Sequence, residues 1–195
     1  MQIKVGFIGH SYIRDICSLG VSEIEVDNFN IHFKYFYKPG GNLRNITHGD
    51  IFVKSLLEYK PEIVFLFIGG NDLRLDFPLK ETIYLYKEFF HFLKSKLPSS
   101  VFICSTVEPR FAPANERFCT LGPDVYKTLT HKFNRFMKKW DLPDRKFLTW
   151  GANRLENREL FKKDLVHLNE RGLHLLWELM EDLVVRVVKE KFSNK

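Results

Sequence analysis

The chain has 195 residues, of which 45% are hydrophobic and 28% charged, and these proportions exclude a disordered or fibrous protein and suit one compact domain. Its three cysteines, Cys17, Cys104 and Cys119, have neither the even number of a disulfide framework nor the spacing of a zinc site. The net charge of +6 permits attraction to nucleic acid or anionic lipid, but basic residues occur only in pairs, so we expect any such contact to be weak and nonspecific.

The first apolar run, residues 3–8, begins almost at the N-terminus. It is too short, and too broken by Lys4, to be the apolar segment of a signal peptide. No run approaches the roughly 18 apolar residues that a transmembrane helix needs. We therefore expect a soluble cytoplasmic protein, unless the chain is a domain excised from a longer one that carries its own targeting signals.

Short apolar runs alternate along the whole chain with segments of helical period, which is typical of a sheet built from βαβ units. Most of the runs are of the kind that is buried on both faces of a parallel sheet. In the second run, apolar residues alternate with His32 and Lys34, so this strand should have one wetter face and lie nearer an edge. The strands are predicted at residues 3–8, 31–37, 63–68, 101–107 and 146–150.

Between these strands, apolar residues recur at steps of three and four, which places them on one side of a helix. Pro61 and Pro98 end two of these helical segments. We assign the apolar stripes to the core and not to a ligand site. The stripes cover residues 52–59, 83–97, 125–140 and 173–187, and no linker or repeat interrupts them, so one domain over residues 1–195 is expected.

Small and polar residues follow the first two strands. Gly9, His10 and Ser11 come directly after residues 3–8, and a serine at such a strand-to-helix turn can present its hydroxyl with its backbone N–H free. A nucleophile needs this arrangement, although a lone serine after glycine is more often a helix N-cap. Paired Gly40 and Gly41 can turn an N–H towards a ligand, and a plain turn is the alternative.

Gly70, Asn71 and Asp72 follow the very apolar third strand. Asparagine or aspartate often caps a turn, so this motif alone does not distinguish a cap from a functional group. Its position favours function, because the carboxyl ends of parallel strands meet at one edge of a sheet. We therefore expect the three motifs to lie close together there.

Asp164 and His167 lie in a predicted turn just before the last helix. A carboxylate three residues before a histidine can reach one ring nitrogen and leave the other to take a proton from a serine. A lone histidine at a helix start is usually a cap or a surface residue. The other histidines have no comparable carboxylate and turn, and we assign them to structural roles.

Taken in order, these motifs resemble the sequence blocks of the SGNH (or GDSL) hydrolase family, named for its catalytic Ser, Gly, Asn and His. The match spans nearly the whole chain, and the order of four short motifs is far more specific than any one. Two positions depart from the usual blocks: His10 stands where the family has Asp, and Gly40 where it often has Ser. The matching residues are Gly9, His10 and Ser11; Gly41; Gly70, Asn71 and Asp72; and Asp164 with His167.

The resemblance implies a flavodoxin-like, three-layer α/β/α fold and a serine esterase that needs no metal or organic cofactor. It implies that Ser11 is the nucleophile, His167 the base and Asp164 the residue that orients the base. The N–H groups of Ser11 and Gly41 and the side chain of Asn71 would form the oxyanion hole. Within the family, the Gly-His-Ser variant and residues 166–172 look most like the SGNH domains of LINE-type retrotransposon first open-reading-frame proteins.

The long irregular segment after the fourth strand, residues 108–123, is a natural wall or lid for a pocket. We expect Phe111 and Phe118, with Arg110 and Arg117, to line the acyl pocket, and His10 to lie close to Ser11. The expected substrate is a small-molecule or lipid ester with a small to medium acyl group, cleaved through an acyl-serine intermediate. The alternative is an SGNH-fold module that binds RNA or anionic lipid, with vestigial catalysis.

Overall fold

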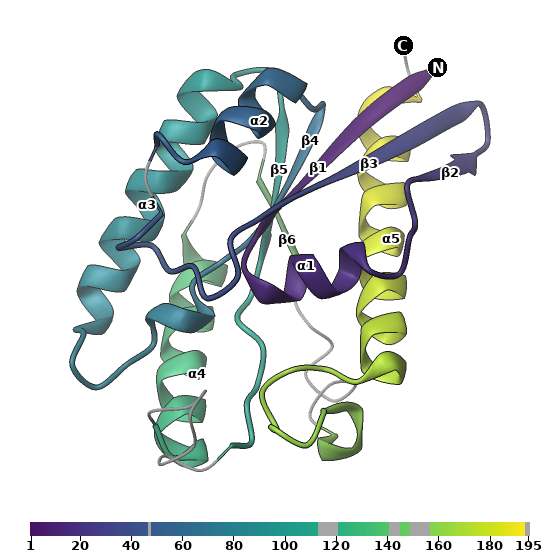
Figure 1. Ribbon diagram of the computed structural model, residues 1–195. Coiled ribbons are helices and arrows are strands. Elements are labelled where there is room, and N and C mark those ends of the chain that lie inside the picture. Colours follow the sequence, from purple (N-terminus) through teal and green to yellow (C-terminus); the bar gives the residue numbers. More distant parts are fainter. Residues whose placement is uncertain (47, 113–120, 141–144, 149–156, 194–195) are drawn as a thin grey trace.

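The structure is a computed structural model that describes residues 1–46, 48–112, 121–140, 145–148 and 157–193. A six-stranded sheet with the order β2-β3-β1-β4-β5-β6 runs through its centre (Figure 1). Neighbouring strands are parallel, except for the antiparallel pair β2 and β3. The strands are β1 (Gln2–Gly9), β2 (Glu23–Val26), β3 (Phe29–Tyr37), β4 (Ile63–Phe67), β5 (Val101–Ser105) and β6 (Arg145–Leu148).

Helices cover both faces of the sheet, which gives the three-layer α/β/α fold that the sequence predicted (Figure 1). On one face lie α1 (Ser11–Cys17) and α5 (Glu170–Phe192). On the other lie α2 (Ile51–Tyr59), α3 (Leu79–Lys96) and α4 (Pro123–Lys139). Without the antiparallel strand β2, the strand order is that of flavodoxin-like folds.

The core consists of two apolar layers, one between the sheet and each group of helices. Strand β1 contributes to both, because successive side chains point to opposite faces of a sheet. Phe7 lies in the layer beneath α5, where its ring is 5.9 Å from that of Trp177 and 5.2 Å from that of Phe65. Ile8 lies in the other layer with Leu66. These contacts pack the central strands against the helices on both faces of the sheet.

The wetter strand predicted near an edge is β3, in which Lys34 is exposed while Ile31 and Phe33 are buried. It is not the edge strand itself, because β2 pairs with it. The sequence analysis missed β2, although its four residues, Glu23–Val26, alternate between polar and apolar side chains, the shortest run that can indicate a strand. The fourth predicted strand is also shorter than expected, since β5 ends at Ser105 and the chain continues as a loop.

The chain leaves β1 and β4 towards opposite faces of the sheet, α1 on one side and the 3-10 turn Gly70–Asp72 on the other. Such a divergence between neighbouring parallel strands opens a crevice at their carboxyl ends, where open α/β sheets place their sites. In the part of the chain that the structure describes, no helix has both the length and the apolar character needed to cross a membrane.

The last residue of β1 leaves no room for a side chain. A Cβ atom on Gly9 would lie 2.2 Å from the carbonyl oxygen of Phe67, its partner in β4. The added Cβ would be fixed to the backbone of β1, and the Phe67 oxygen belongs to the backbone of β4, so neither can move aside without disturbing the pairing of the two strands. Glycine at this position is therefore a packing requirement.

We expect Gly9→Ala to lower the free energy of unfolding by about 1–3 kcal/mol, the usual cost of forcing extra volume into a packed region. Urea denaturation would measure the change. Gly20→Ala serves as a comparison, because Gly20 has a φ of +76° and no atom near its missing Cβ. It should cost only backbone strain, roughly 1–2 kcal/mol. A Gly9→Ala variant as stable as the wild type would show that the strands accommodate a side chain.

Candidate active site

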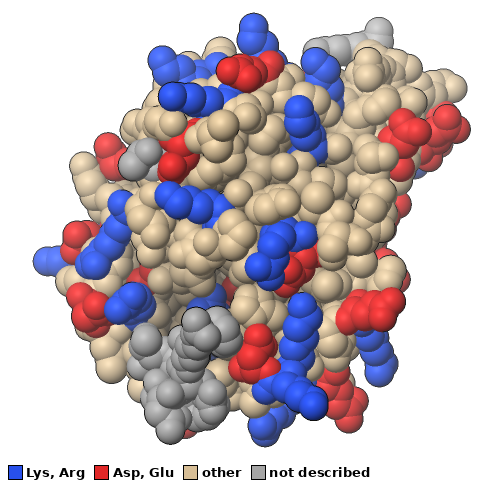
Figure 2. Space-filling model, in the orientation of Figure 1, with Lys and Arg blue, Asp and Glu red and all other residues tan. Residues whose placement is uncertain are grey.

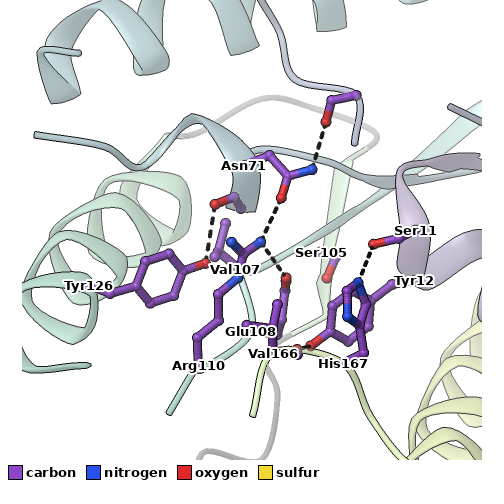
Figure 3. Close-up of polar contacts among 12 residues, drawn as sticks. Ser11, Tyr12, Asn71, Ser105, Val107, Glu108, Arg110, Tyr126, Val166 and His167 are labelled. Carbon is purple, nitrogen blue, oxygen red and sulfur yellow. Dashed lines mark hydrogen bonds and ion pairs between the residues drawn. The ribbon is translucent and has the colours of Figure 1, made fainter. Parts of the chain in front are cut away.

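Ser11 is the first residue of α1, and its hydroxyl does not cap the helix. The N-cap position belongs to His10, whose side chain makes no capping hydrogen bond. The hydroxyl of Ser11 lies instead 3.1 Å from Nε2 of His167, 156 residues further along the chain (Figure 3). The backbone N–H of Ser11 opens the helix, where the first N–H groups have no intrahelical acceptor.

The turn before α5 is organised by one carboxylate. Oδ1 of Asp164 accepts the backbone N–H groups of Val166 and His167 at 3.0 and 2.9 Å, and Oδ2 lies 2.7 Å from Nδ1 of His167. Burial opposes ionisation of Asp164, but these hydrogen bonds outweigh it and lower its pKa. The carboxylate therefore orients the ring, with Nε2 directed at Ser11.

Two further contacts hold this turn against the rest of the site. The hydroxyl of Tyr12 donates to the carbonyl of Val166 at 2.5 Å, and the N–H of Phe111 donates to the carbonyl of Leu165 at 2.8 Å. Tyr12 directly follows Ser11 in α1. Tyr12 therefore holds in place the same turn whose His167 contacts Ser11 (Figure 3). The sequence analysis missed Tyr12, because no local pattern links a tyrosine to a turn so far along the chain.

Asn71 lies in the 3-10 turn that follows β4. Its Nδ2 donates to the carbonyl of Gly41 at 2.9 Å (Figure 3). The N–H of Gly41, which the family resemblance places in the oxyanion hole, donates to the carbonyl of Lys38 at 2.8 Å and so closes a turn. Nδ2 carries two hydrogens, and the contact with Gly41 uses one of them.

Arg110 lies buried beside Asn71. Its Nη2 donates to Oδ1 of Asn71 at 2.7 Å and lies 3.6 Å from Oε1 of Glu108. The guanidinium lies 4.9 Å from the ring centre of Tyr126, whose hydroxyl donates to the carbonyl of Gly70 (Figure 3). The sequence analysis did not single out Glu108, although a carboxylate directly after an apolar strand was a usable signal.

His10 is buried beside the site between two aromatic rings. Its ring centre lies 5.7 Å from that of Tyr12 and 5.8 Å from that of Phe67. Burial lowers the pKa of His10 to about 3, and the positive charge of Arg110 and the neighbouring His167 act in the same direction. His10 is therefore a neutral imidazole that packs among aromatic side chains.

Phe111 packs edge-on against Phe161, with ring centres 5.0 Å apart. It also lines a cavity of about 650 Å³ between α4 and the loop that follows β5. Arg110 lines the same cavity, whereas Ser11 and His167 are not among its described lining residues. Phe118 and Arg117, the other predicted pocket residues, lie outside the described residues.

No protein-family model and no curated protein matches the sequence. Solved structures match the fold. A carbohydrate esterase family 3 protein from Talaromyces cellulolyticus has a TM-score of 0.63 at 13% identity, over 96% of this chain and 99% of that one. A lipase/acylhydrolase from Enterococcus faecalis has a TM-score of 0.58 at 17% identity, over 99% and 98%. A GDSL-like lipase from Bacteroides thetaiotaomicron has a TM-score of 0.56 at 15% identity, over 96% of this chain and 88% of that one.

At these identities the likeness is one of fold. The chain is an α/β protein with the fold of GDSL-like lipases and esterases, and three of its sequence motifs follow the carboxyl ends of β1, β3 and β4. Within the described part of the chain, there is no group of three or more His, Cys, Asp or Glu side chains that could hold a metal ion.

Asp72 is a buried carboxyl group next to Asn71, with 2% of its surface exposed. Its Oδ1 accepts the N–H of Leu43 at 2.8 Å. Burial raises the pKa of Asp72. The hydrogen bond from Leu43 and the charges of Arg44 and Arg110 lower it by a smaller amount, and the net result is a pKa of about 7. The folded state therefore holds this proton up to a higher pH than the unfolded chain, and stability falls as pH rises from about 4 to 7.

We expect Asp72→Asn to remove this loss of stability with rising pH. Relative to the variant, the wild type should lose free energy of unfolding on the order of 1 kcal/mol per pH unit between about pH 4 and 7. Above that range the difference between the two proteins should not grow further. Urea denaturation of both proteins at several pH values would measure it. Asp76→Asn is the control, because Asp76 is exposed and Arg74 lowers its pKa. A constant difference between wild type and Asp72→Asn would contradict the expectation.

Proposed function

We propose that this chain is an SGNH-type serine esterase that cleaves small to medium carboxylic esters through an acyl-serine intermediate. The observation that carries the proposal is the hydrogen-bonded series from Ser11 through His167 to Asp164, with distances of 3.1 and 2.7 Å. A serine hydroxyl is a poor nucleophile until a neighbouring base takes its proton. The esterase fold and the order of the motifs support the same assignment.

In the proposed acylation step, His167 Nε2 takes the proton of Ser11 as Oγ attacks the acyl carbonyl carbon. The carbonyl electron pair moves to oxygen and forms a tetrahedral oxyanion. When this collapses, the alcohol leaves with the proton from His167 and the acyl group stays on Ser11. Asp164 stabilises the imidazolium without taking a proton itself.

Deacylation repeats the sequence with water as the nucleophile. His167 takes one proton from the water as its oxygen attacks the acyl carbon. Collapse of the second oxyanion breaks the bond to Ser11 Oγ, which receives the proton back, and the carboxylic acid is released. No group beyond Ser11, His167, Asp164 and the oxyanion donors is needed for either step.

The proposed oxyanion hole combines the N–H of Ser11 with the second hydrogen on Nδ2 of Asn71. These donors come from α1 and from the turn after β4. A contribution from the N–H of Gly41 would require its hydrogen bond to Lys38 to open when substrate binds.

The substrate that we propose is a small-molecule or lipid ester. The retrotransposon-type subgroup stays a proposal that rests on the Gly-His-Ser variant and residues 166–172. On the face of the molecule that Figure 2 shows, Lys and Arg are interspersed with Asp and Glu. That face therefore does not offer the continuous basic surface that an RNA- or lipid-binding module would need.

A fluorophosphonate probe should label the protein covalently at Ser11. Ser11→Ala should abolish labelling and His167→Ala should nearly do so, because the base activates the hydroxyl. Asp164→Ala should weaken labelling less, since that residue only orients and stabilises the imidazole. Mass spectrometry of the labelled peptide would identify the site.

His174→Ala is the matched control for this experiment, because His174 is an exposed histidine on α5, the helix that follows the His167 turn. It should label like the wild type. Labelling that survives in His167→Ala and disappears in His10→Ala would move the base to His10. If the folded wild type is not labelled and hydrolyses none of a panel of p-nitrophenyl esters, the esterase proposal fails and the binding module takes its place.

Asn71→Ala should lower turnover of a good ester by roughly 10²-fold to 10³-fold, the usual effect of removing one oxyanion donor. Folding should change little, because the turn keeps its backbone contacts. Steady-state kinetics with p-nitrophenyl acetate, alongside a thermal melt, would measure both. A loss of turnover below about threefold would remove Asn71 from the oxyanion hole, given the size of that effect.

A further inference from the structure

The side-chain amide of Asn71 is held on both of its polar atoms. Oδ1 accepts from Nη2 of Arg110 at 2.7 Å, and Nδ2 donates to the carbonyl of Gly41 at 2.9 Å (Figure 3). A guanidinium can only donate and a carbonyl can only accept. A flipped amide would place N–H against N–H and oxygen against oxygen, so only one orientation satisfies both neighbours.

From this arrangement we propose that Arg110 is a positioning residue, which orients and polarises the amide of Asn71 so that its remaining N–H binds the oxyanion. The proposal rests on the esterase function proposed above and names the residue that prepares its oxyanion hole. Arg110 itself does not touch the substrate in this scheme.

Polarisation follows from the charge on Arg110. A hydrogen bond from a charged donor is shorter and stronger than a neutral one, and it draws electron density towards Oδ1 of the amide. Hydrogen bonds in series strengthen one another, so the N–H groups on Nδ2 of Asn71 become better donors. The effect is larger here than at a surface, because the Arg110 side chain is 8% exposed and little water screens it.

Arg110 is itself fixed by its surroundings. Oε1 of Glu108, whose side chain is 2% exposed, lies 3.6 Å from Nη2, and the ring of Tyr126 lies under the guanidinium. A Cβ atom on Gly70 would lie 2.9 Å from Oε1 of Glu108 and 3.2 Å from Nη2 of Arg110. The backbone before Asn71 thus packs directly on the ion pair, which leaves the guanidinium little freedom to swing away.

Two other roles for Arg110 make different predictions. If it bound an anionic part of the substrate directly, its loss would raise KM for anionic esters and would not depend on Asn71. If it were only a structural residue, its loss would lower stability and leave kcat per folded molecule unchanged. A positioning role predicts a loss in kcat that requires the amide of Asn71.

The test is a double-mutant cycle measured with p-nitrophenyl acetate, in which kcat and KM are determined for each variant. Removing Arg110 alone would leave Glu108 as an unpaired buried carboxylate, so the main variant is Arg110→Met combined with Glu108→Gln. Arg110→Lys keeps a charged donor and is the conservative variant. Each is made with Asn71 and with Asn71→Ala, and thermal melts establish the folded fraction.

With Asn71 present, we expect the Arg110→Met, Glu108→Gln protein to lose roughly 10-fold to 100-fold in kcat, the range seen when a group that orients a functional residue is removed, with KM nearly unchanged. The Arg110→Lys protein should retain a higher kcat than the Arg110→Met, Glu108→Gln protein. In the Asn71→Ala background, neither change should lower kcat by more than about twofold, since sites that act as a unit are not additive. Arg74→Met, at an exposed arginine paired with Asp76, should behave like the wild type.

The outcomes separate this inference from the esterase proposal. If the wild type hydrolyses no ester, the proposed function fails and the inference fails with it. If the wild type is active and folded Arg110 variants keep its kcat, only the inference fails. An equal loss of kcat with and without Asn71 would also overturn it, because Arg110 would then act independently of the amide.

Discussion

The close approach of β1 and β4 at Gly9 is the constraint on which the rest of the site depends. Backbone of one strand lies where a side chain of the other would be, so the two carboxyl ends are held at a short, fixed separation. Ser11 follows one of these ends and Asn71 the other. The chain then diverges to opposite faces of the sheet, with α1 on one face and the turn Gly70–Asp72 on the other, so the two residues approach the site from different sides.

Several ionisable groups are buried around the site, among them His10, Asp72, Glu108 and Arg110. Burying a charge is costly unless it is paired, and burial raises the pKa of Glu108 while the charge of Arg110 opposes that rise. Perturbed groups of this kind concentrate at functional sites, although structural ion pairs also produce them. Here the burial has a local use: it keeps Arg110 close to Asn71 and largely free of screening by water.

Much of the fold could be predicted because periodicity survives in the sequence. The stripe in residues 173–187 and the apolar run 63–68 report burial on one side of a helix and on both sides of a strand, so α5 and β4 were expected close to where they lie. Strand β2 was missed, since its alternation of polar and apolar residues extends over only four positions. Its partner β3 was predicted to lie nearer an edge, and it is the second strand from the edge of the sheet.

For the site, the sequence by itself determined which groups are available and in what order, because a motif such as Asp164 with His167 carries its own geometry within one turn. Only the tertiary structure decided their partners. It joined Tyr12 to the turn at Val166, occupied the N–H of Gly41, and placed Arg110 against the amide of Asn71. These contacts join residues from separate loops, and their distances depend on how strands and helices pack, which no local pattern of residues records.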